Sequence, residues 1–195
     1  MRKLKNSELG RKSIDQYRNS EKLPLIIVLD NVRSQGNVGS VFRTADAFLV
    51  EAVYLCGITA TPPHREIQKT ALGATESVSW KYFRTTYEAV EELRSQGREI
   101  IGVEQAEGST PLDMIRVDKK KRYALVFGHE INGVAQEIID QCDHVIEIPQ
   151  FGTKHSFNIA VSAGIVLWEI SKNLTPLLGC ARSFPSPGGE GLEKS

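Results

Sequence analysis

Five polar residues have side chains that could act together in catalysis, and each follows an apolar run of the chain. They are Asn37, Arg43, Glu130, Ser156 and Asn158. The set offers one cation, one carboxylate and three neutral hydrogen-bonding groups, without a cysteine nucleophile, a zinc-ligand set or a Walker lysine. One pocket lined by these residues would position a polar substrate beside a bound cofactor rather than perform covalent or metal catalysis.

Each of these residues also has a structural interpretation that the sequence leaves open. Asn37, Ser156 and Asn158 stand near helix starts, where their side chains could cap the first turn. Glu130 could be a solvated loop carboxylate, or could bond the first amides of its helix. Arg43 lies opposite the apolar face of its helix and could simply be solvated.

Two other site types are disfavoured by spacing. No metal site is expected, because the four histidines lack ligand spacing: His64, His129, His144 and His155. The glycine loop at 36–39 (GNVG) is not GxGxxG, and the next strand does not end in an acidic residue that would hold a ribose. A nucleotide-dependent oxidoreductase is therefore a weak hypothesis.

Short apolar runs alternate with helical patterns along the chain. We predict strands at 25–29, 52–56, 77–83, 99–103, 124–128 and 144–148. Helices are expected from 38 to 49, from 61 to 73, from 85 to 93, briefly after Thr110–Pro111, for about two turns after 134, and from about 156 to 170. This alternation predicts an α/β fold with a mostly parallel sheet covered by helices on both faces. The five polar residues would then gather beyond the carboxyl ends of the strands, where such sheets bind ligands.

The chain divides into three parts by composition. Residues 1–22 form a basic helix or arm, residues 23–174 one α/β domain, and residues 175–195 a Pro-, Gly- and Ser-rich tail expected to be disordered. The formal net charge is zero, yet residues 1–22 and 119–122 are basic clusters. These clusters are either solvated faces or contacts for a phosphate backbone, and composition does not decide between the two.

The last predicted helix is apolar nearly all round, which indicates burial on every side. Its small residues, Ala160, Ala163 and Gly164, permit close approach, so it is either an interior helix or a contact with a partner subunit. The chain lacks a signal peptide and an apolar run long enough to span a bilayer, and its three cysteines form no CxxC pair. We expect a soluble, cytoplasmic protein.

Three ordered stretches carry a family resemblance: NVRSQGNVGSVFRTADAF at 31–48, LVFGHEINGV at 125–134 and IPQFGTKHSFNIAVSAG at 148–164. With KTALGATESVSW at 69–80, they resemble the SpoU (TrmH-like) RNA 2′-O-ribose methyltransferases of the SPOUT superfamily. Leu49, Gln150 and Phe157 stand where that family usually has glycine, methionine and leucine.

The resemblance implies a fold, a cofactor and partners. It implies a C-terminal trefoil knot, S-adenosylmethionine as cofactor, a homodimer, and a structured RNA substrate, with tRNA favoured over rRNA. The implied cofactor-binding positions are Val103, Glu104, Gly128, Ile148 and Phe157, and the implied catalytic positions are Asn37, Arg43, Glu130, Ser156 and Asn158. An RNA-binding protein of the same fold without catalysis is the alternative.

Overall fold

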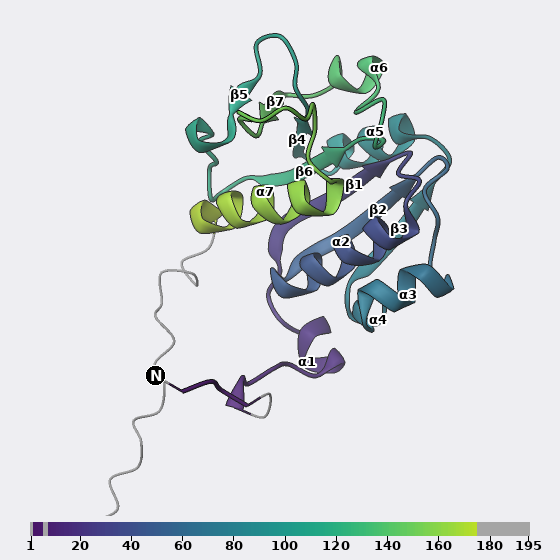
Figure 1. Cartoon of the computed structure of the whole chain (residues 1–195), viewed down its shortest axis with the longest axis vertical. Helices are drawn as coiled ribbons and strands as arrows, with labels where there is room; N and C mark the ends of the chain where they lie inside the picture. The colour runs from purple at the N-terminus through teal and green to yellow at the C-terminus, as the bar shows by residue number, and fades with distance from the viewer. Residues whose placement is uncertain (1, 6–7, 175–195) are drawn as a thin grey trace, which may run out of the picture.

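The computed structural model describes residues 2–5 and 8–174, and its centre is a seven-stranded sheet whose neighbouring strands all run parallel (Figure 1). The strand order is β3-β2-β1-β6-β4-β7-β5. The strands are β1 Leu23–Asp30, β2 Val50–Cys56, β3 Ser79–Phe83, β4 Arg98–Val103, β5 Thr110–Pro111, β6 Arg122–Phe127 and β7 His144–Glu147. The tail predicted at 175–195 lies outside the described residues.

The helices follow the strands along the chain. They are α1 Ile14–Arg18, α2 Gln35–Ala47, α3 Arg65–Ala71, α4 Ala74–Ser77, α5 Thr86–Ser95, the 3-10 helix η2 Leu112–Met114, α6 Gln136–Ile139 and α7 Ile159–Leu174. Thr85 caps α5 by accepting a hydrogen bond from the Glu88 amide at 3.2 Å, as its capping-box spacing predicts.

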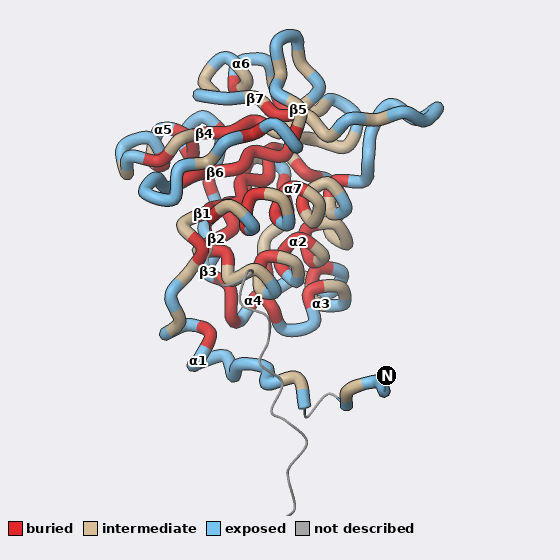
Figure 2. The backbone as a smooth tube through the Cα atoms, turned by 90° about the vertical axis from the view of Figure 1, so that its left-hand side faces the viewer, coloured by how far each residue is buried: buried red, intermediate tan, exposed pale blue. Residues whose placement is uncertain are grey.

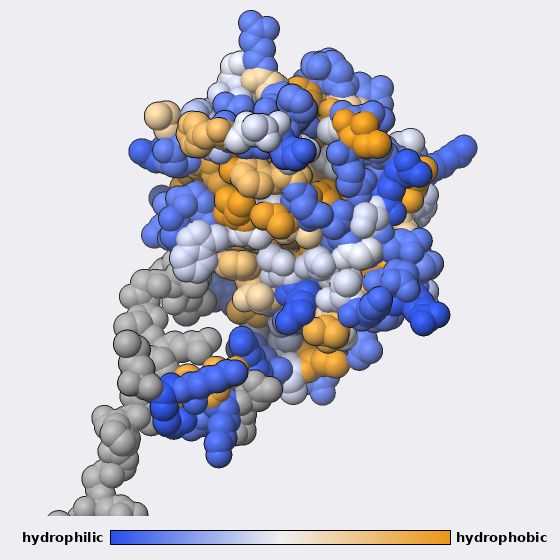
Figure 3. Space-filling model, viewed as in Figure 1, coloured by the Kyte–Doolittle hydropathy of each residue, from blue (hydrophilic) through white to orange (hydrophobic). Residues whose placement is uncertain are grey.

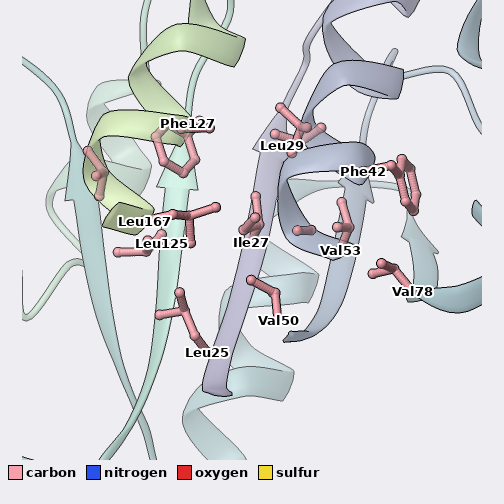
Figure 4. Packing of buried hydrophobic residues seen from close by; sticks show 14 of the residues in the cluster. Leu25, Ile27, Leu29, Phe42, Val50, Val53, Val78, Leu125, Phe127 and Leu167 are labelled. Atoms are coloured by element: carbon pink, nitrogen blue, oxygen red, sulfur yellow. The ribbon is translucent and has the colours of Figure 1, made fainter. Parts of the chain in front are cut away.

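Side chains that alternate along β1 separate two apolar layers. Leu25, Ile27 and Leu29 pack on the face covered by α2 and α7 (Figure 4), whereas Ile26 and Val28 pack on the face covered by α5 and α6. Buried positions accordingly concentrate along the strands (Figure 2). The predicted α/β class, with a mostly parallel sheet and helices on both faces, is confirmed.

Several predicted boundaries are wrong. The helix expected from Thr61 begins at Arg65, because the Pro62–Pro63 pair disfavours helical backbone at the residue before each proline. The N-terminal helix is reduced to α1, and the helix after residue 134 is only the four residues of α6. The strand expected from Ser77 begins at Ser79, since Ser77 ends α4.

The last helix is buried on one face rather than on every side. Ala163, Leu167 and Ile170 are buried against the sheet, while Val161 is 50% exposed and Trp168 54% exposed. Apolar side chains are correspondingly visible over α7 in the space-filling view (Figure 3). Within one chain, the outer face of α7 is therefore open.

The position of β6 determines which loops meet. It lies between β1 and β4, with Leu29 opposite Phe127 and Val103 opposite Phe127. The segments that leave the carboxyl ends of β1, β4 and β6 therefore start side by side. The trefoil knot stays a prediction.

Two further features concern single elements. Leu49 has a φ of 55°, a left-handed conformation that favours glycine, and it stands where the resembling sequences usually carry glycine. In the described part of the chain, no helix is long and apolar enough to cross a membrane.

Candidate functional site

The segment after β6 is a closed turn built on two glycines. His129 and Gly133 exchange backbone hydrogen bonds, each 2.9 Å long. A Cβ on Gly128 would lie 2.0 Å from the carbonyl carbon of Gly133 and 2.1 Å from the amide nitrogen of Val134. Gly133 itself has a φ of 67°. Side chains at these two positions would force the turn apart, so the glycines let the turn fold back against the end of β6.

Glu130, carried on this turn, links it to the segment after β1. Its carboxylate accepts hydrogen bonds from the amides of Arg33 at 3.1 Å and Ser34 at 2.9 Å. Asn37 Nδ2 donates to the same carboxylate at 3.3 Å. The interpretation of Glu130 as a free, solvated loop carboxylate is therefore wrong, because it holds the start of α2.

The hydrogen bonds also determine the charge state of Glu130. Burial acts to raise the pKa of its carboxyl, but the donors from Ser34, Glu130 itself, Arg33 and Asn37 outweigh burial and leave that pKa below its ordinary value. An acceptor engaged in this way stays ionised near neutral pH and is a poor proton acceptor.

Asn158 extends the network to α7. Its Oδ1 accepts from the amides of Ala160 at 2.9 Å and Val161 at 3.4 Å, which makes it the N-terminal cap of the helix. Its Nδ2 donates to Asn37 Oδ1 at 3.1 Å. Three predicted catalytic residues, Glu130, Asn37 and Asn158, thus form one hydrogen-bonded row that joins the turn after β6, the first turn of α2 and the start of α7.

A cavity of about 270 Å³ lies beside this row, at the carboxyl ends of β4, β6 and β7. Every position predicted to bind the cofactor lines it: Val103, Glu104, Gly128, Ile148 and Phe157. Ser156 and Glu130 line the same cavity. Gln105 Nε2 donates to the His155 carbonyl at 2.7 Å and ties the segment after β4 to the one before α7. The positions that the sequence groups as cofactor-binding are therefore brought together in space.

Arg43 does not reach this cavity. It lines a second cavity, of about 470 Å³, between residues 9–17 and the helices α2 and α4, together with Asp46. Arg43 follows Asn37 by six residues, which places it about 9 Å further along α2 and on a different face. Within one chain, the pocket expected to hold all five polar residues is divided.

The first cavity has a marked charge. It is lined by three carboxylates, from Glu104, Glu130 and Glu147, and none of the described residues around it is a lysine or an arginine. The two histidines, His129 and His155, complete its titratable groups. Such a lining suits a ligand that carries positive charge, as the sulfonium and ammonium groups of S-adenosylmethionine do.

One contributor to the site, Asp30, was not identified from the sequence, and one predicted contributor, Glu104, has a contact that was not foreseen. Asp30, buried at the end of β1, accepts hydrogen bonds from Thr86 Oγ1, Asn31 Nδ2 and the Ala135 amide, and so joins the segments before α5 and α6. Glu104, predicted as a cofactor-binding position, has a structural contact as well, because its carboxylate accepts from the Val134 amide at 2.9 Å. An acidic residue directly at a strand end was the available signal for Asp30.

In the described ranges 2–5 and 8–174, no group of three or more His, Cys, Asp and Glu residues is arranged to hold a metal ion.

Comparison with known proteins identifies relatives along most of the chain. The family model described as the SpoU rRNA Methylase family matches residues 24–168. A 23S rRNA (guanosine-2′-O-)-methyltransferase, RlmB, of Neisseria meningitidis serogroup B is 33% identical over 155 residues. That match covers 80% of this chain and 61% of the Neisseria protein, so the chain spans about three fifths of the length of this relative.

Solved structures agree with the fold. The A. aeolicus TrmH/SpoU tRNA modifying enzyme superposes with a TM-score of 0.72 at 26% identity, covering 82% of this chain and 81% of that one. The AdoMet-bound rRNA methyltransferase from Sinorhizobium meliloti gives 0.72 at 28% identity, covering 85% of this chain and 62% of that one. With a family model matched over most of its length, the chain belongs to the SpoU rRNA Methylase family.

Proposed function

We propose that this protein transfers a methyl group from S-adenosylmethionine to a ribose 2′-hydroxyl in structured RNA. The observation that carries the proposal is the carboxylate-lined cavity at the ends of β4, β6 and β7, next to the row of Glu130, Asn37 and Asn158. The family membership and the AdoMet-bound Sinorhizobium relative support the same cofactor.

The cofactor would be held by Val103, Glu104, Gly128, Ile148 and Phe157. When bound, S-adenosylmethionine supplies an electrophilic methyl group that needs no further activation by the protein. The contribution of the chain is then to hold the ribose in line with that methyl group, and such positioning supplies roughly 7–11 kcal/mol. Ser156 lines the cavity and is proposed to contact the substrate there.

Proton removal is not assigned to either charged residue. Glu130 has a pKa below its ordinary value because amide donors surround it, so it serves to position the turn and Asn37. A guanidinium, the side-chain group of Arg43, is not a usable base in proteins. We propose that Arg43 orients the 2′-hydroxyl and a neighbouring phosphate as a cation; because Arg43 does not reach the first cavity of its own chain, this role requires the homodimer proposed below.

The substrate is proposed to be tRNA in preference to rRNA, and both require testing. The relatives differ by name, since the A. aeolicus structure is a tRNA modifying enzyme and the Neisseria protein a 23S rRNA methyltransferase. The basic segment 1–22 would contact the phosphate backbone outside the cavity. In the second basic cluster, Lys121 pairs with Glu99 and Arg122 donates to the Gln96 carbonyl, which leaves Lys119 and Lys120 for such contacts.

A homodimer is proposed as the functional form. The support is the open face of α7, where Val161 and Trp168 are half-exposed apolar side chains beside the small residue Gly164. Addition of a Cβ at Gly164 would meet no atom within 4 Å in one chain. Close helix approach across this face would remove these side chains from water.

The proposal is tested by measuring methyl transfer to cellular tRNA and rRNA, followed by mapping of 2′-O-methyl sites. Wild type should modify RNA, and Arg43→Ala should lose at least tenfold in rate, whereas Arg65→Ala, an exposed arginine in the first turn of α3, should not. Equal rates for wild type and Arg43→Ala would remove Arg43 from the mechanism. Calorimetric binding of S-adenosylmethionine without any methyl transfer to RNA would refute the enzyme. The absence of both would favour the non-catalytic RNA-binding alternative.

A further inference from the structure

The turn after β6 is closed by a side chain as well as by its backbone. His129 Nδ1 accepts hydrogen bonds from the amide of Ile131 at 3.0 Å and from the amide of Asn132 at 3.3 Å. The imidazole thus occupies the inside of the turn between His129 and Gly133. Ile131 and Asn132 are exposed, so the turn is held from within rather than by packing over it.

This arrangement requires one protonation state of His129. Two N–H donors point at Nδ1, so that nitrogen must offer its lone pair, and the ring proton is assigned to Nε2. An imidazolium carries a proton on both nitrogens and would direct a third N–H group at the two amides. The closed turn is therefore compatible only with neutral His129.

The turn forms one wall of the first cavity. All five residues from His129 to Gly133 line it. The same turn carries Glu130, which holds the start of α2, and it continues into the Val134 amide that binds Glu104. Opening the turn would move the cavity wall and the row of Glu130, Asn37 and Asn158 together.

We propose that His129 is a positioning residue whose neutral imidazole keeps the cofactor cavity formed, so that cofactor affinity falls when the imidazole is protonated. The identity of the ligand rests on the proposed function. The role of His129 in the turn does not.

Other titratable groups face the same cavity and must be separated from His129. They are Glu104 at the end of β4, Glu147 at the end of β7, His155 before α7, and Glu130 in the turn itself. Carboxylates titrate near pH 4, well below imidazoles, which take up a proton near pH 6.5 in water. His155 is thus the other imidazole at this cavity, and its contribution has to be measured separately.

The direction in which cofactor affinity changes with pH follows from the fractions of neutral and protonated imidazole. One pH unit below the pKa at which an imidazole takes up its proton, about one ring in eleven is neutral, so an affinity that requires the neutral form is about tenfold weaker. Above that pKa the affinity should be constant.

The test is calorimetric titration of the full chain with S-adenosylmethionine between pH 5 and pH 8. Wild type should bind about tenfold more weakly at the acid end. His129→Asn should bind S-adenosylmethionine at the acid end as well as at pH 8, so that its affinity no longer depends on pH. The reason is that its Oδ1 can accept hydrogen bonds from the same two amides in an Asx turn and does not titrate. His129→Ala should bind weakly at every pH. His155→Gln should keep the wild-type pH dependence, whatever its absolute affinity.

Two results of the binding experiment would overturn the proposal: His129→Asn with the pH dependence of wild type, or His129→Ala with wild-type affinity at pH 8. A ligand-free measurement separates this proposal from the proposed function. Hydrogen-exchange protection of the Ile131 and Asn132 amides should fall with acid in wild type and stay constant in His129→Asn. Unchanged protection in wild type would refute the role of His129 even if the cofactor binds. If the cofactor does not bind but protection falls, only the proposed function fails.

Discussion

At the scale of single residues, Glu130 is a predicted catalytic carboxylate whose observed contacts hold other groups in position. Its oxygens accept from two backbone amides and from Asn37, in a half-buried position between the segments after β1 and β6. A carboxylate that accepts hydrogen bonds from three donors is a weak base, and the donors in turn need it as their acceptor. Removal of its charge would leave them facing an acceptor that has lost part of its capacity.

We expect Glu130→Gln to lower the free energy of unfolding by about 1–3 kcal/mol, since the NH2 group of the glutamine side chain would face N–H donors that now bind a carboxylate oxygen. Urea unfolding measures this, with Glu107→Gln, an exposed loop carboxylate, as the matched control without effect.

The contribution of Glu130 to the free energy of unfolding depends on pH with a definite sign. Because the folded pKa of Glu130 lies below the ordinary 4.5, its stabilisation is complete above pH 4.5 and is lost as the pH falls through the folded value. The free energy of unfolding of Glu130→Gln should lack this pH-dependent contribution. If Glu130→Gln loses stability in acid as steeply as wild type does, the assignment is wrong.

At the scale of elements, the start of α7 joins two tasks in one side chain. Asn158 Oδ1 caps the helix and its Nδ2 binds Asn37. The sequence allowed Asn158 to be either a cap or a site residue; the contacts confirm the cap and also join Asn158 to Asn37, while its part in catalysis stays a prediction. The geometry of the row therefore depends on where the helix begins.

Substitution can separate the two tasks of Asn158. Asn158→Asp keeps the acceptor for the Ala160 amide and loses the donor to Asn37, so stability should be retained while methyl transfer falls. Asn158→Ala loses both and should also cost about 0.5–2 kcal/mol of stability in thermal unfolding. If Asn158→Asp transfers methyl groups at the wild-type rate, the bond to Asn37 has no part in the reaction.

The elements differ in how far the sequence could predict them. Continuous apolar runs such as Leu25–Leu29 predict buried parallel strands, because both faces of β1 are covered. The start of α3 was misplaced because its cap is His64, whose Nδ1 accepts from the Glu66 amide at 3.3 Å, and histidine is an uncommon cap. Local signals identify strands better than they identify such starts.

The site was predictable only in part for a related reason. Motifs at strand ends correctly grouped the residues around the first cavity. The bonds from Glu130 to Asn37 and from Asn37 to Asn158 join residues 93 and 121 positions apart, and no local pattern encodes them. Arg43 was grouped with them through the family resemblance, and the sequence does not reveal that its side of α2 faces residues 9–17 rather than the first cavity.

At the scale of the whole molecule, the outer face of α7 is an exposed apolar surface on a helix whose other face packs in the core. Trp168 is 54% exposed on it and Val161 50% exposed, while the opposite face is buried in the core. Two half-exposed apolar side chains on one helix are costly to hydrate but favourable to bury between subunits.

We expect wild type to be a dimer in solution by light scattering coupled to size exclusion, and Trp168→Glu to shift it to monomers. Trp80→Glu is the matched control, because Trp80 is also partly exposed, at 38%, but lies on β3 at the other end of the sheet. A monomeric wild type at micromolar concentration, or a dimer that survives Trp168→Glu, would exclude α7 as the interface.

The insertion of β6 between β1 and β4 has a consequence for biosynthesis. β1 and β4 are translated well before Arg122–Phe127, yet each pairs with β6 and not with the other. A nascent chain shorter than about 127 residues exposes an unpaired apolar strand edge on each, the kind of edge that promotes aggregation. The middle of the sheet can therefore close only after β6 has been translated, with β7 still to be added between β4 and β5, and the turn carrying Glu130 emerges from the ribosome immediately after β6.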